Sequence, residues 1–489
     1  MLNSVDFGGR PFHFIGIGGI GMSALAYVLT QRKLPVSGSD LSHSHITQRL
    51  EKQGAHIFWS QDAANLEALQ PVGYEAGHES VTQARAAAPQ VICSTAISAE
   101  NAEYRAALSL GCPIFHRSDL LAALMQEYEG IAIAGTHGKT TTSSMVGYLL
   151  MKAGLDPTII VGGEVNAWEG NARIGQSPYL VAEADESDGS LVKLAAKIGV
   201  VTNIELDHPD HYATLEEVIA TFQTFAQQCE TLIGCIDSPT LKSCLQPHIT
   251  YSIQPNAKAD YTVDNIVYKS DGTIAQVWER GALLGTLQLG LLGNHNLSNA
   301  LAAIAVGRQL GLGFAEIAPI LTTFEGARRR FECRGEYNQI LFIDDYAHHP
   351  SEIQVTLNAA RLRAQTSTQR RRVVAVFQPH RYSRTQTFLS EFAESFGDAD
   401  LVITTEIYSA GEPNTGQVTG QSLSEAIAAH HPQVIYQPTL SEVATYLQAA
   451  LLPGDLVLFL GAGNLNRIIP ELMAFCQAED SVSSALSPV

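Results

Sequence analysis

The fold is decided by the stretch Ile131-Ala132-Ile133-Ala134-Gly135-Thr136-His137-Gly138-Lys139-Thr140-Thr141-Thr142. Residues 131–134 are small and apolar, as in a buried parallel strand, and helical spacing continues from residue 140 to 152. A strand, a glycine turn and a helix start direct backbone N–H groups toward one point, where a phosphate binds. Lys139 adds a charge for the β- and γ-phosphates, and the Thr140 hydroxyl is placed to ligate Mg²⁺. This short G-x-x-G-K-T motif predicts an ATP site made of Gly135, Thr136, His137, Gly138, Lys139, Thr140 and Thr141.

Length and composition restrict the class of protein. The chain has 489 residues, which suggests about three domains. Its net charge of −19 argues against binding to nucleic acid or to an anionic membrane. The seven cysteines contain no C-x-x-C pair and fit a reducing compartment, so we expect a cytoplasmic protein. The apolar segment 12–29 is interrupted by glycines and is too short and irregular to span a bilayer.

A second glycine motif lies near the N-terminus. Residues 12–15 predict a strand, residues 16–21 (GIGGIG) a turn, and residues 22–31 a helix. Asp40 follows the next expected strand, and further strands are expected at 55–59, 91–97 and 113–116. This Rossmann-like pattern places a pyrophosphate at a helix N-terminus, which suits NAD as well as a UDP-sugar. We interpret residues 61–90, which are polar and rich in alanine, as a surface excursion.

Acidic side chains and a histidine follow two further strands of the expected central sheet. Residues 178–184 form one strand, and Glu183 near its end is a candidate Mg²⁺ ligand. Glu186 and Asp188 are as consistent with a solvated acidic loop as with metal binding. Residues 198–204 form the other strand, and His208 after it is a candidate metal ligand oriented by Asp207. The sequence therefore predicts a metal site at the carboxyl edge of this sheet.

The C-terminal part of the chain has a second doubly wound α/β pattern. Strands are expected at 340–344, 373–377, 401–405, 434–436 and 456–460, with amphipathic helices between them. Polar residues gather at 344–350 and 378–384, where two of these strands end. Before this part, residues 293–296 open a helix expected at 297–310, and their Asn and His side chains either cap the helix or reach a base edge.

These motifs together resemble those of the Mur ligase family. The resemblance runs from residue 12 to about 469 and rests on HFIGIGGIGMS, GTHGKTTT, EADESD, TNIELDH, GNHNLSNALAA, RRRF, DDYAHHP and FQPHRYSRT. It implies an α/β protein with a Rossmann-like UDP-sugar-binding domain at 1–126, a central P-loop ATP-binding domain at 127–325 and a Rossmann-like amino-acid-binding domain at 326–489. It is greatest to the branch that uses ATP and Mg²⁺ to join L-alanine to the lactyl carboxylate of UDP-N-acetylmuramate. That reaction passes through an acyl phosphate and belongs to peptidoglycan synthesis.

The resemblance also implies roles for individual residues. Mg²⁺ would be held by Thr140, Glu183 and His208, and the chemistry would be carried by Lys139, Glu183, His208, His348 and Arg384. Adenine would lie near Asn294, His295 and Asn299, with Arg330 and Asp345 reaching the nucleotide from across the cleft. The UDP-sugar would contact Gly18, Gly19, Gly21, Asp40, Ser94 and Ala96. The amino acid would contact Tyr346, His380, Arg381 and Arg384, although both arginines could instead be surface residues that pair with neighbouring acids.

The chain departs from the family pattern near Phe222, where several Mur ligases carbamylate a lysine to bridge metals. No lysine is found there, which fits the alanine-adding branch. Ala347 stands where this branch often has glycine. Three other functions stay open: an NAD-dependent dehydrogenase, a P-loop regulator that binds ATP without forming a bond, and a recycling ligase that attaches a whole tripeptide. The intact first glycine motif favours the alanine-adding enzyme, which we expect to be a monomer or a homodimer.

Overall fold

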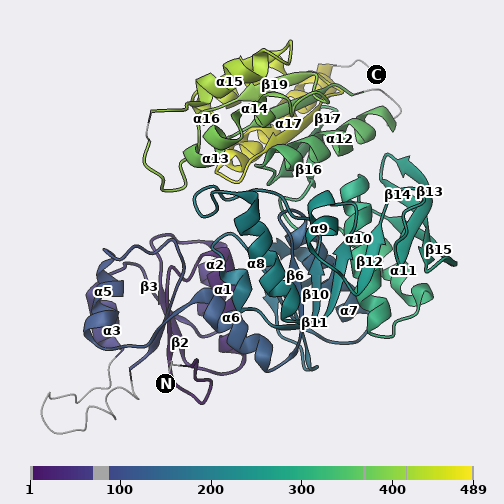
Figure 1. The fold of residues 1–489 in the computed structure, drawn as a ribbon. Helices are drawn as coiled ribbons and strands as arrows, with labels where there is room; N and C mark the ends of the chain where they lie inside the picture. The colour runs from purple at the N-terminus through teal and green to yellow at the C-terminus, as the bar shows by residue number, and fades with distance from the viewer. Residues whose placement is uncertain (1–3, 70–87, 367–370, 415, 487–489) are drawn as a thin grey trace, which may run out of the picture.

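The computed structural model describes residues 4–69, 88–366, 371–414 and 416–486. Three mostly parallel sheets follow one another along the chain, each flanked by helices (Figure 1). The chain is therefore an α/β protein of three domains, as the sequence predicts. Most of the expected surface excursion, residues 70–87, lies outside the described residues. Within the described part of the chain, no helix is long and apolar enough to cross a membrane.

The N-terminal sheet is parallel, with the strand order β3-β2-β1-β4-β5. The order reverses between β1 (Phe12–Ile15) and β4 (Gln90–Cys93), and α/β sheets bind ligands at such a point. The first glycine motif follows β1 directly and leads into α1 (Ile20–Gln31). The remaining elements are β2 (Val36–Ser39), β3 (His56–Phe58), β5 (Ile114–His116), α2 (His45–Lys52), α3 (Ala63–Ala68), α5 (Ala102–Ser109) and α6 (Arg117–Gln126).

The central sheet has ten strands in the order β15-β14-β13-β12-β11-β10-β6-β9-β7-β8. The P-loop strand β6 (Glu129–Ala134) lies between β9 (Tyr179–Glu183) and β10 (Ala196–Val201), and the three strands are parallel. Because parallel strands end at the same edge, the P-loop, Glu183 and the segment after β10 meet there. The remaining strands are β7 (Thr158–Val165), β8 (Gly170–Arg173), β11 (Cys229–Cys235), β12 (Ile249–Ser252), β13 (Tyr261–Lys269), β14 (Gly272–Glu279) and β15 (Ala282–Leu289).

The P-loop helix α7 (Lys139–Lys152) runs through the core of the central domain. All its residues from Thr140 to Leu150 are buried, and it packs against α10 (Asn294–Gln309) and α11 (Phe314–Thr322). This packing fixes the P-loop on a rigid element. The other helical elements of the domain are α8 (Leu215–Gln227), α9 (Pro239–Cys244) and two short 3₁₀ turns, η1 (Asn166–Trp168) and η2 (Ser190–Lys193).

The C-terminal sheet has the order β16-β17-β21-β18-β19-β20. All five expected strands are present, and an antiparallel edge strand, β16 (Glu332–Tyr337), is added to them. The strands are β17 (Ile340–Asp345), β18 (Val373–Phe377), β19 (Leu401–Thr404), β20 (Val434–Tyr436) and β21 (Leu456–Leu460). The helices are α12 (Pro350–Thr366), α13 (Tyr382–Thr387), α14 (Leu389–Ala393), α15 (Gly420–Ala428), α16 (Leu440–Ala450), η3 (Leu465–Ile468) and α17 (Ile469–Leu486).

Candidate active site

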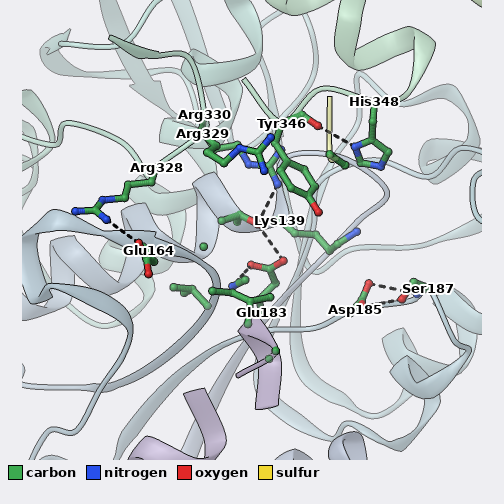
Figure 2. A pocket seen from close by; sticks show the side chains of 18 of the residues that line it. Lys139, Glu164, Glu183, Asp185, Ser187, Arg328, Arg329, Arg330, Tyr346 and His348 are labelled. Carbon is green, nitrogen blue, oxygen red and sulfur yellow. Dashed lines mark hydrogen bonds and ion pairs between the residues drawn. The ribbon is translucent and has the colours of Figure 1, made fainter. Parts of the chain in front are cut away.

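A cavity of about 1090 Å³ lies where the three domains meet. Figure 2 shows side chains of the central domain and of the third domain that face each other across it. The N-terminal domain contributes the end of its glycine motif and the loop after β4. The lining residues used below are Gly19, Gly21, Ser94, Arg117, Lys139, Thr140, Glu183, Asp185, Asp207, His208, Arg330, Tyr346, His348, Glu352, His380, Arg381 and Arg384.

The two P-loop glycines are required by the backbone and by close packing. Gly135 and Gly138 have φ values of +136° and +81°, in the region that favours glycine. A Cβ atom on Gly138 would lie 2.8 Å from the Asn299 side-chain oxygen, and one on Gly135 would overlap the Thr202 hydroxyl. The P-loop backbone therefore packs closely against the Thr202 and Asn299 side chains. The start of α7 stays open to the cavity, as a phosphate site requires.

The Lys139 ammonium group is held by four oxygen atoms. Its Nζ donates to the Gly135 and Thr136 carbonyls at 2.8 and 3.1 Å and to both Glu186 carboxylate oxygens at 2.9 Å. Burial raises the pKa of the Glu186 carboxyl to about 7, although Lys139 opposes this rise. Glu186 is thus a buried partner of the P-loop lysine, and the solvated-loop interpretation of this residue is wrong.

Thr140 and Glu183 form an oxygen-rich pair beside the P-loop. The Thr140 hydroxyl donates to Glu183 Oε1 at 3.0 Å, and the Gly162 backbone N–H donates to Glu183 Oε2 at 2.7 Å. A hydroxyl and a carboxylate are hard oxygen ligands, so the pair fits Mg²⁺. His208 joins a different group, because its ring and the Asp185 and Glu186 carboxylates have ligand atoms within 4.8 Å of one another. The placement of His208 with the first pair stays a prediction.

Three histidine rings line the cavity, those of His348 and His380 from the third domain and that of His208 from the central domain. Burial lowers the pKa of His348 to about 4, that of His380 to about 2, and that of His208 below its usual value. The His348 Nδ1 atom lies 3.0 Å from the Tyr346 carbonyl oxygen, which can only accept, so Nδ1 carries the hydrogen. The Nε2 atom of His348 is therefore left with a lone pair that can accept a proton.

The two arginines expected to bind the amino acid both pair with acids of the central domain. Arg384 is buried, and its Nε donates to Asp207 Oδ1 at 2.8 Å. Arg381 is partly exposed and pairs with Asp210 at 3.1 Å and with Glu412 of its own domain at 3.2 Å. Both guanidinium groups line the cavity, and their contact with an amino acid stays a prediction.

A smaller cavity of about 140 Å³ adjoins the P-loop. Of the residues expected near the nucleotide, it is lined by His137, Gly138, Thr141, His295, Asn299, Arg330 and Asp345. Asn294 does not line it, and the oxygen of its side chain accepts from the Tyr268 hydroxyl. Arg330 bridges toward the P-loop, where its Nη2 lies 3.4 Å from the Thr140 hydroxyl oxygen. The cavity therefore joins the two domains, and the contact of Arg330 with a nucleotide stays a prediction.

Three of the six residues expected to contact the UDP-sugar line the cavity. Gly19, Gly21 and Ser94 line the cavity, whereas Gly18, Asp40 and Ala96 do not. The Gly18 backbone N–H donates to Asp40 Oδ2 at 2.8 Å, so Asp40 supports the glycine loop, and its contact with a UDP-sugar stays a prediction. Sequence reasoning missed Arg117, which pairs with Asp185 at 3.0 Å. The sequence feature that could have indicated Arg117 is its position: a basic residue begins α6 directly after strand β5.

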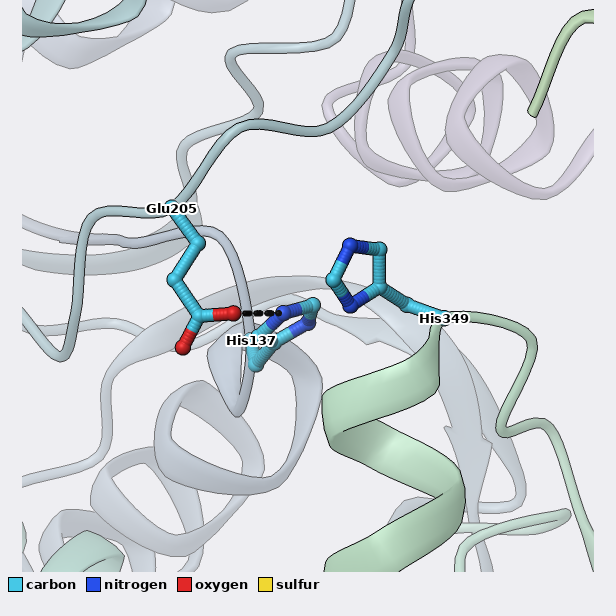
Figure 3. Close-up of side chains that lie close together, drawn as sticks. All are labelled: His137, Glu205 and His349. Carbon is cyan, nitrogen blue, oxygen red and sulfur yellow. Dashed lines mark ion pairs between the residues drawn. The ribbon is translucent and has the colours of Figure 1, made fainter. Parts of the chain in front are cut away.

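His137 of the P-loop lies between Glu205 and His349 (Figure 3). Its Nε2 lies 3.3 Å from Glu205 Oε2, and its Nδ1 lies 3.2 Å from Glu352 Oε1 of the third domain. The His349 ring lies beside it, with 4.7 Å between the ring centroids. Burial opposes a charge on His137, but the two carboxylates outweigh it and raise its pKa to about 10. The two carboxylates therefore favour the charged form of this ring, the imidazolium.

Comparison with known proteins agrees with this geometry. Family models described as "Mur ligase family, catalytic domain", "Mur ligase middle domain" and "Mur ligase, glutamate ligase domain" match residues 11–129, 133–307 and 329–463. The chain is 67% identical to UDP-N-acetylmuramate–L-alanine ligase of Nostoc punctiforme over 99% of this chain and 100% of that protein. It is 61% identical to the protein of that name from Acaryochloris marina, over 100% and 99% of the two chains.

Solved structures give the same result. The structure of UDP-N-acetylmuramate–alanine ligase from Thermotoga maritima is similar, with a TM-score of 0.78 and 27% identity over 97% of this chain and 99% of that chain. A murein peptide ligase from Psychrobacter arcticus shares the fold, with a TM-score of 0.68 and 23% identity over 96% and 99% of the two chains. The three matched domains and the full-length relatives lead to one conclusion: this chain belongs to the Mur ligase family.

Proposed function

We propose that this chain is an ATP-dependent ligase that joins L-alanine to the lactyl carboxylate of UDP-N-acetylmuramate, in peptidoglycan synthesis. The observation that carries the proposal is the single cavity lined by all three domains, with Lys139 and Glu183 facing His348 and Arg384 across it. The full-length relatives of 61–67% identity, which bear the name of this reaction, support it. The seven cysteines, all described and none in a disulfide, support a place in the cytoplasm.

Each of the three domains would bind a different substrate. Residues 1–126 would bind the UDP-sugar at the strand-order reversal between β1 and β4, where the glycine motif reaches the cavity. Residues 127–325 would bind ATP at the P-loop and in the smaller cavity beside it. Residues 326–489 would supply the amino-acid site, because Tyr346, His380 and the two arginines line the cavity from that domain.

The residues around the P-loop would hold ATP and Mg²⁺. Lys139 and the start of α7 would bind the phosphates, with Lys139 exchanging Glu186 for phosphate oxygens. Thr140 and Glu183 would hold Mg²⁺, which when bound spreads the negative charge of the transferred phosphoryl group. Arg330, which already reaches Thr140 from the third domain, would add a positive charge on the far side.

A carboxylate does not react with an amine near neutral pH, so the lactyl carboxylate must first be activated as an acyl phosphate. The alanine amine then attacks the acyl carbon, phosphate leaves, and the amine gives up a proton. We assign this proton to His348, because burial keeps the ring neutral and its Nδ1–H already faces the Tyr346 carbonyl. His208, whose pKa is also lowered by burial, is the alternative acceptor. Closure of the third domain would keep water from the acyl phosphate.

A substrate panel separates this function from its rivals. ADP release with UDP-N-acetylmuramate is measured with L-alanine, serine, glycine or the tripeptide as the acceptor. We expect the highest kcat/KM with alanine, whereas a preference for the tripeptide would indicate the recycling ligase. Hydroxylamine, added with ATP and the UDP-sugar but without alanine, should trap the acyl phosphate as a hydroxamate. ATP binding without ADP release under any of these conditions would point to a regulator.

A further inference from the structure

We propose that Glu352 is a positioning residue that joins the P-loop to the histidine which accepts the amine proton. The inference rests on the proposed function and adds a residue to it. Glu352 lies in the first turn of α12, in the third domain, and its side chain is 14% exposed. Together with Gly138 and Arg330, it lines both the large cavity and the smaller nucleotide cavity. It therefore stands at the boundary between the two halves of the reaction.

One oxygen of Glu352 holds the loop of its own domain. Oε2 accepts from the His348 and His349 backbone N–H groups at 3.0 and 3.3 Å, and it lies 3.2 Å from His348 Nδ1. The backbone bonds are those that a glutamate near a helix start commonly makes, and they would be purely structural on their own. The contact with Nδ1 also helps to keep the hydrogen on that atom, which leaves Nε2 of His348 able to accept a proton.

The other oxygen of Glu352 reaches a different domain. Oε1 lies 3.2 Å from Nδ1 of His137, which stands between the two P-loop glycines. Helix capping does not require this contact. It forms only where the start of α12 meets the P-loop, so it links the position of the third domain to the shape of the phosphate-binding loop. Glu205 pairs with the same His137 ring from the central domain, and the bonds described for its side chain do not include His348.

This difference between the two glutamates gives a matched pair of variants. Glu352→Gln keeps the size of the side chain and its capacity to accept the two backbone hydrogen bonds, but removes the charge that faces both histidines. Glu205→Gln removes the charge that faces His137 and His349 but not His348, and the new amide oxygen can still accept from the Ser351 hydroxyl. Glu394→Gln removes an exposed charge elsewhere in the third domain and serves as the control. Each variant is measured for ATP affinity by calorimetry without other substrates, for kcat/KM with alanine at saturating ATP, and for thermal stability.

We expect Glu352→Gln to lose roughly tenfold to hundredfold in ATP affinity and a similar factor in kcat/KM for alanine, as for loss of a charged hydrogen bond. Glu205→Gln should weaken ATP binding by a similar factor and change kcat/KM for alanine by less than threefold or so. Glu394→Gln should resemble the wild type in both. If Glu352→Gln does not fold, His137→Asn leaves α12 intact and should reproduce the loss of ATP affinity.

Two results would overturn the proposal. The first is a Glu352→Gln variant that is less stable but binds ATP and uses alanine as well as Glu394→Gln does, which would make the residue a helix cap only. The second is a Glu352→Gln substitution that lowers kcat/KM for alanine by the same factor in a His348→Asn background as in the wild type, because the two residues would then act independently. If the wild-type enzyme itself failed to consume alanine, the proposed function would fall, while calorimetry would still test the link to the P-loop.

Discussion

The buried ion pair between Asp207 and Arg384 makes Asp207→Asn an informative substitution. Asp207 belongs to the central domain and Arg384 to the third, and Arg384 Nε donates to Asp207 Oδ1 at 2.8 Å. The side chains are 5% and 2% exposed, so water solvates neither charge while the two domains are in contact. Burial works against ionisation of Asp207, but Arg384 outweighs it and holds the pKa of this carboxyl well below its usual value.

The free-energy cost of the Asp207→Asn substitution follows from the burial of the ion pair. Removing one partner of a buried pair costs about 3–5 kcal/mol, because the other charge is left without compensation. When the two domains separate, Arg384 is exposed to water and this cost disappears. We therefore expect the substitution to make domain closure less favourable and to leave the folding stability of each domain unchanged. At about 1.4 kcal/mol for each factor of ten, closure becomes less favourable by roughly 10²–10⁴.

Steady-state kinetics and small-angle X-ray scattering test this reasoning. Asp207→Asn should lower kcat/KM for alanine by at least about tenfold and increase the radius of gyration. Asp210→Asn is the matched control, because Asp210 pairs with Arg381 across the same interface with side chains 36% and 32% exposed. Such a solvated pair contributes about 0–1 kcal/mol, so the control should stay within about fivefold of the wild type. Identical behaviour of the two variants would refute the closure argument.

Three further predictions concern the same cavity. Arg384→Ala should raise the KM for alanine roughly tenfold to hundredfold in steady-state assays, and a larger rise in the KM for ATP would contradict an amino-acid role. Lys139→Ala should lower kcat by ~10²–10³ with an unchanged circular dichroism spectrum, and a loss of only a few-fold would place the catalytic charge elsewhere. The pKa of Asp207 is lowered in the folded state, so its stabilising contribution is present above the unfolded pKa of about 3.9 and is lost as pH falls through the folded value. The difference in domain closure between wild type and Asp207→Asn, followed by the radius of gyration, should therefore be constant from about pH 8 to 5 and shrink below about pH 4.

Local patterns in the sequence predicted most of the parallel framework. The P-loop strand, the first glycine motif and five strands of the third domain stand close to where the sequence places them. Each is marked by a short apolar run that ends in glycine or in polar residues, and such signals are local. The antiparallel strands β14, β15 and β16 were missed, and so were β7, β8 and β11–β13 of the central sheet. Of these, β13 and β16 bury few of their residues, so their sequences carry no long apolar run.

The site was predicted less completely, because its pairings connect distant parts of the chain. The order of motifs indicated Lys139, Thr140 and Glu183, which lie together at adjacent strand ends. The partners of Arg384 and of His137 could not be read from spacing, since each bond depends on how the third domain sits on the central one. The place of Asp40 after a strand suggested ligand contact; the structure adds that its carboxylate accepts from the Gly18 backbone, and the contact with a ligand stays a prediction.

The most direct test of the central claim is the mass of the product. The purified protein is incubated with ATP, Mg²⁺, UDP-N-acetylmuramate and L-alanine, and the nucleotide fraction is analysed by mass spectrometry. Our account predicts a UDP-sugar heavier by one alanyl residue, with one ADP formed for each product molecule and none without the UDP-sugar. An unchanged UDP-sugar mass in the presence of ATP hydrolysis, or a product carrying only a tripeptide, would contradict it.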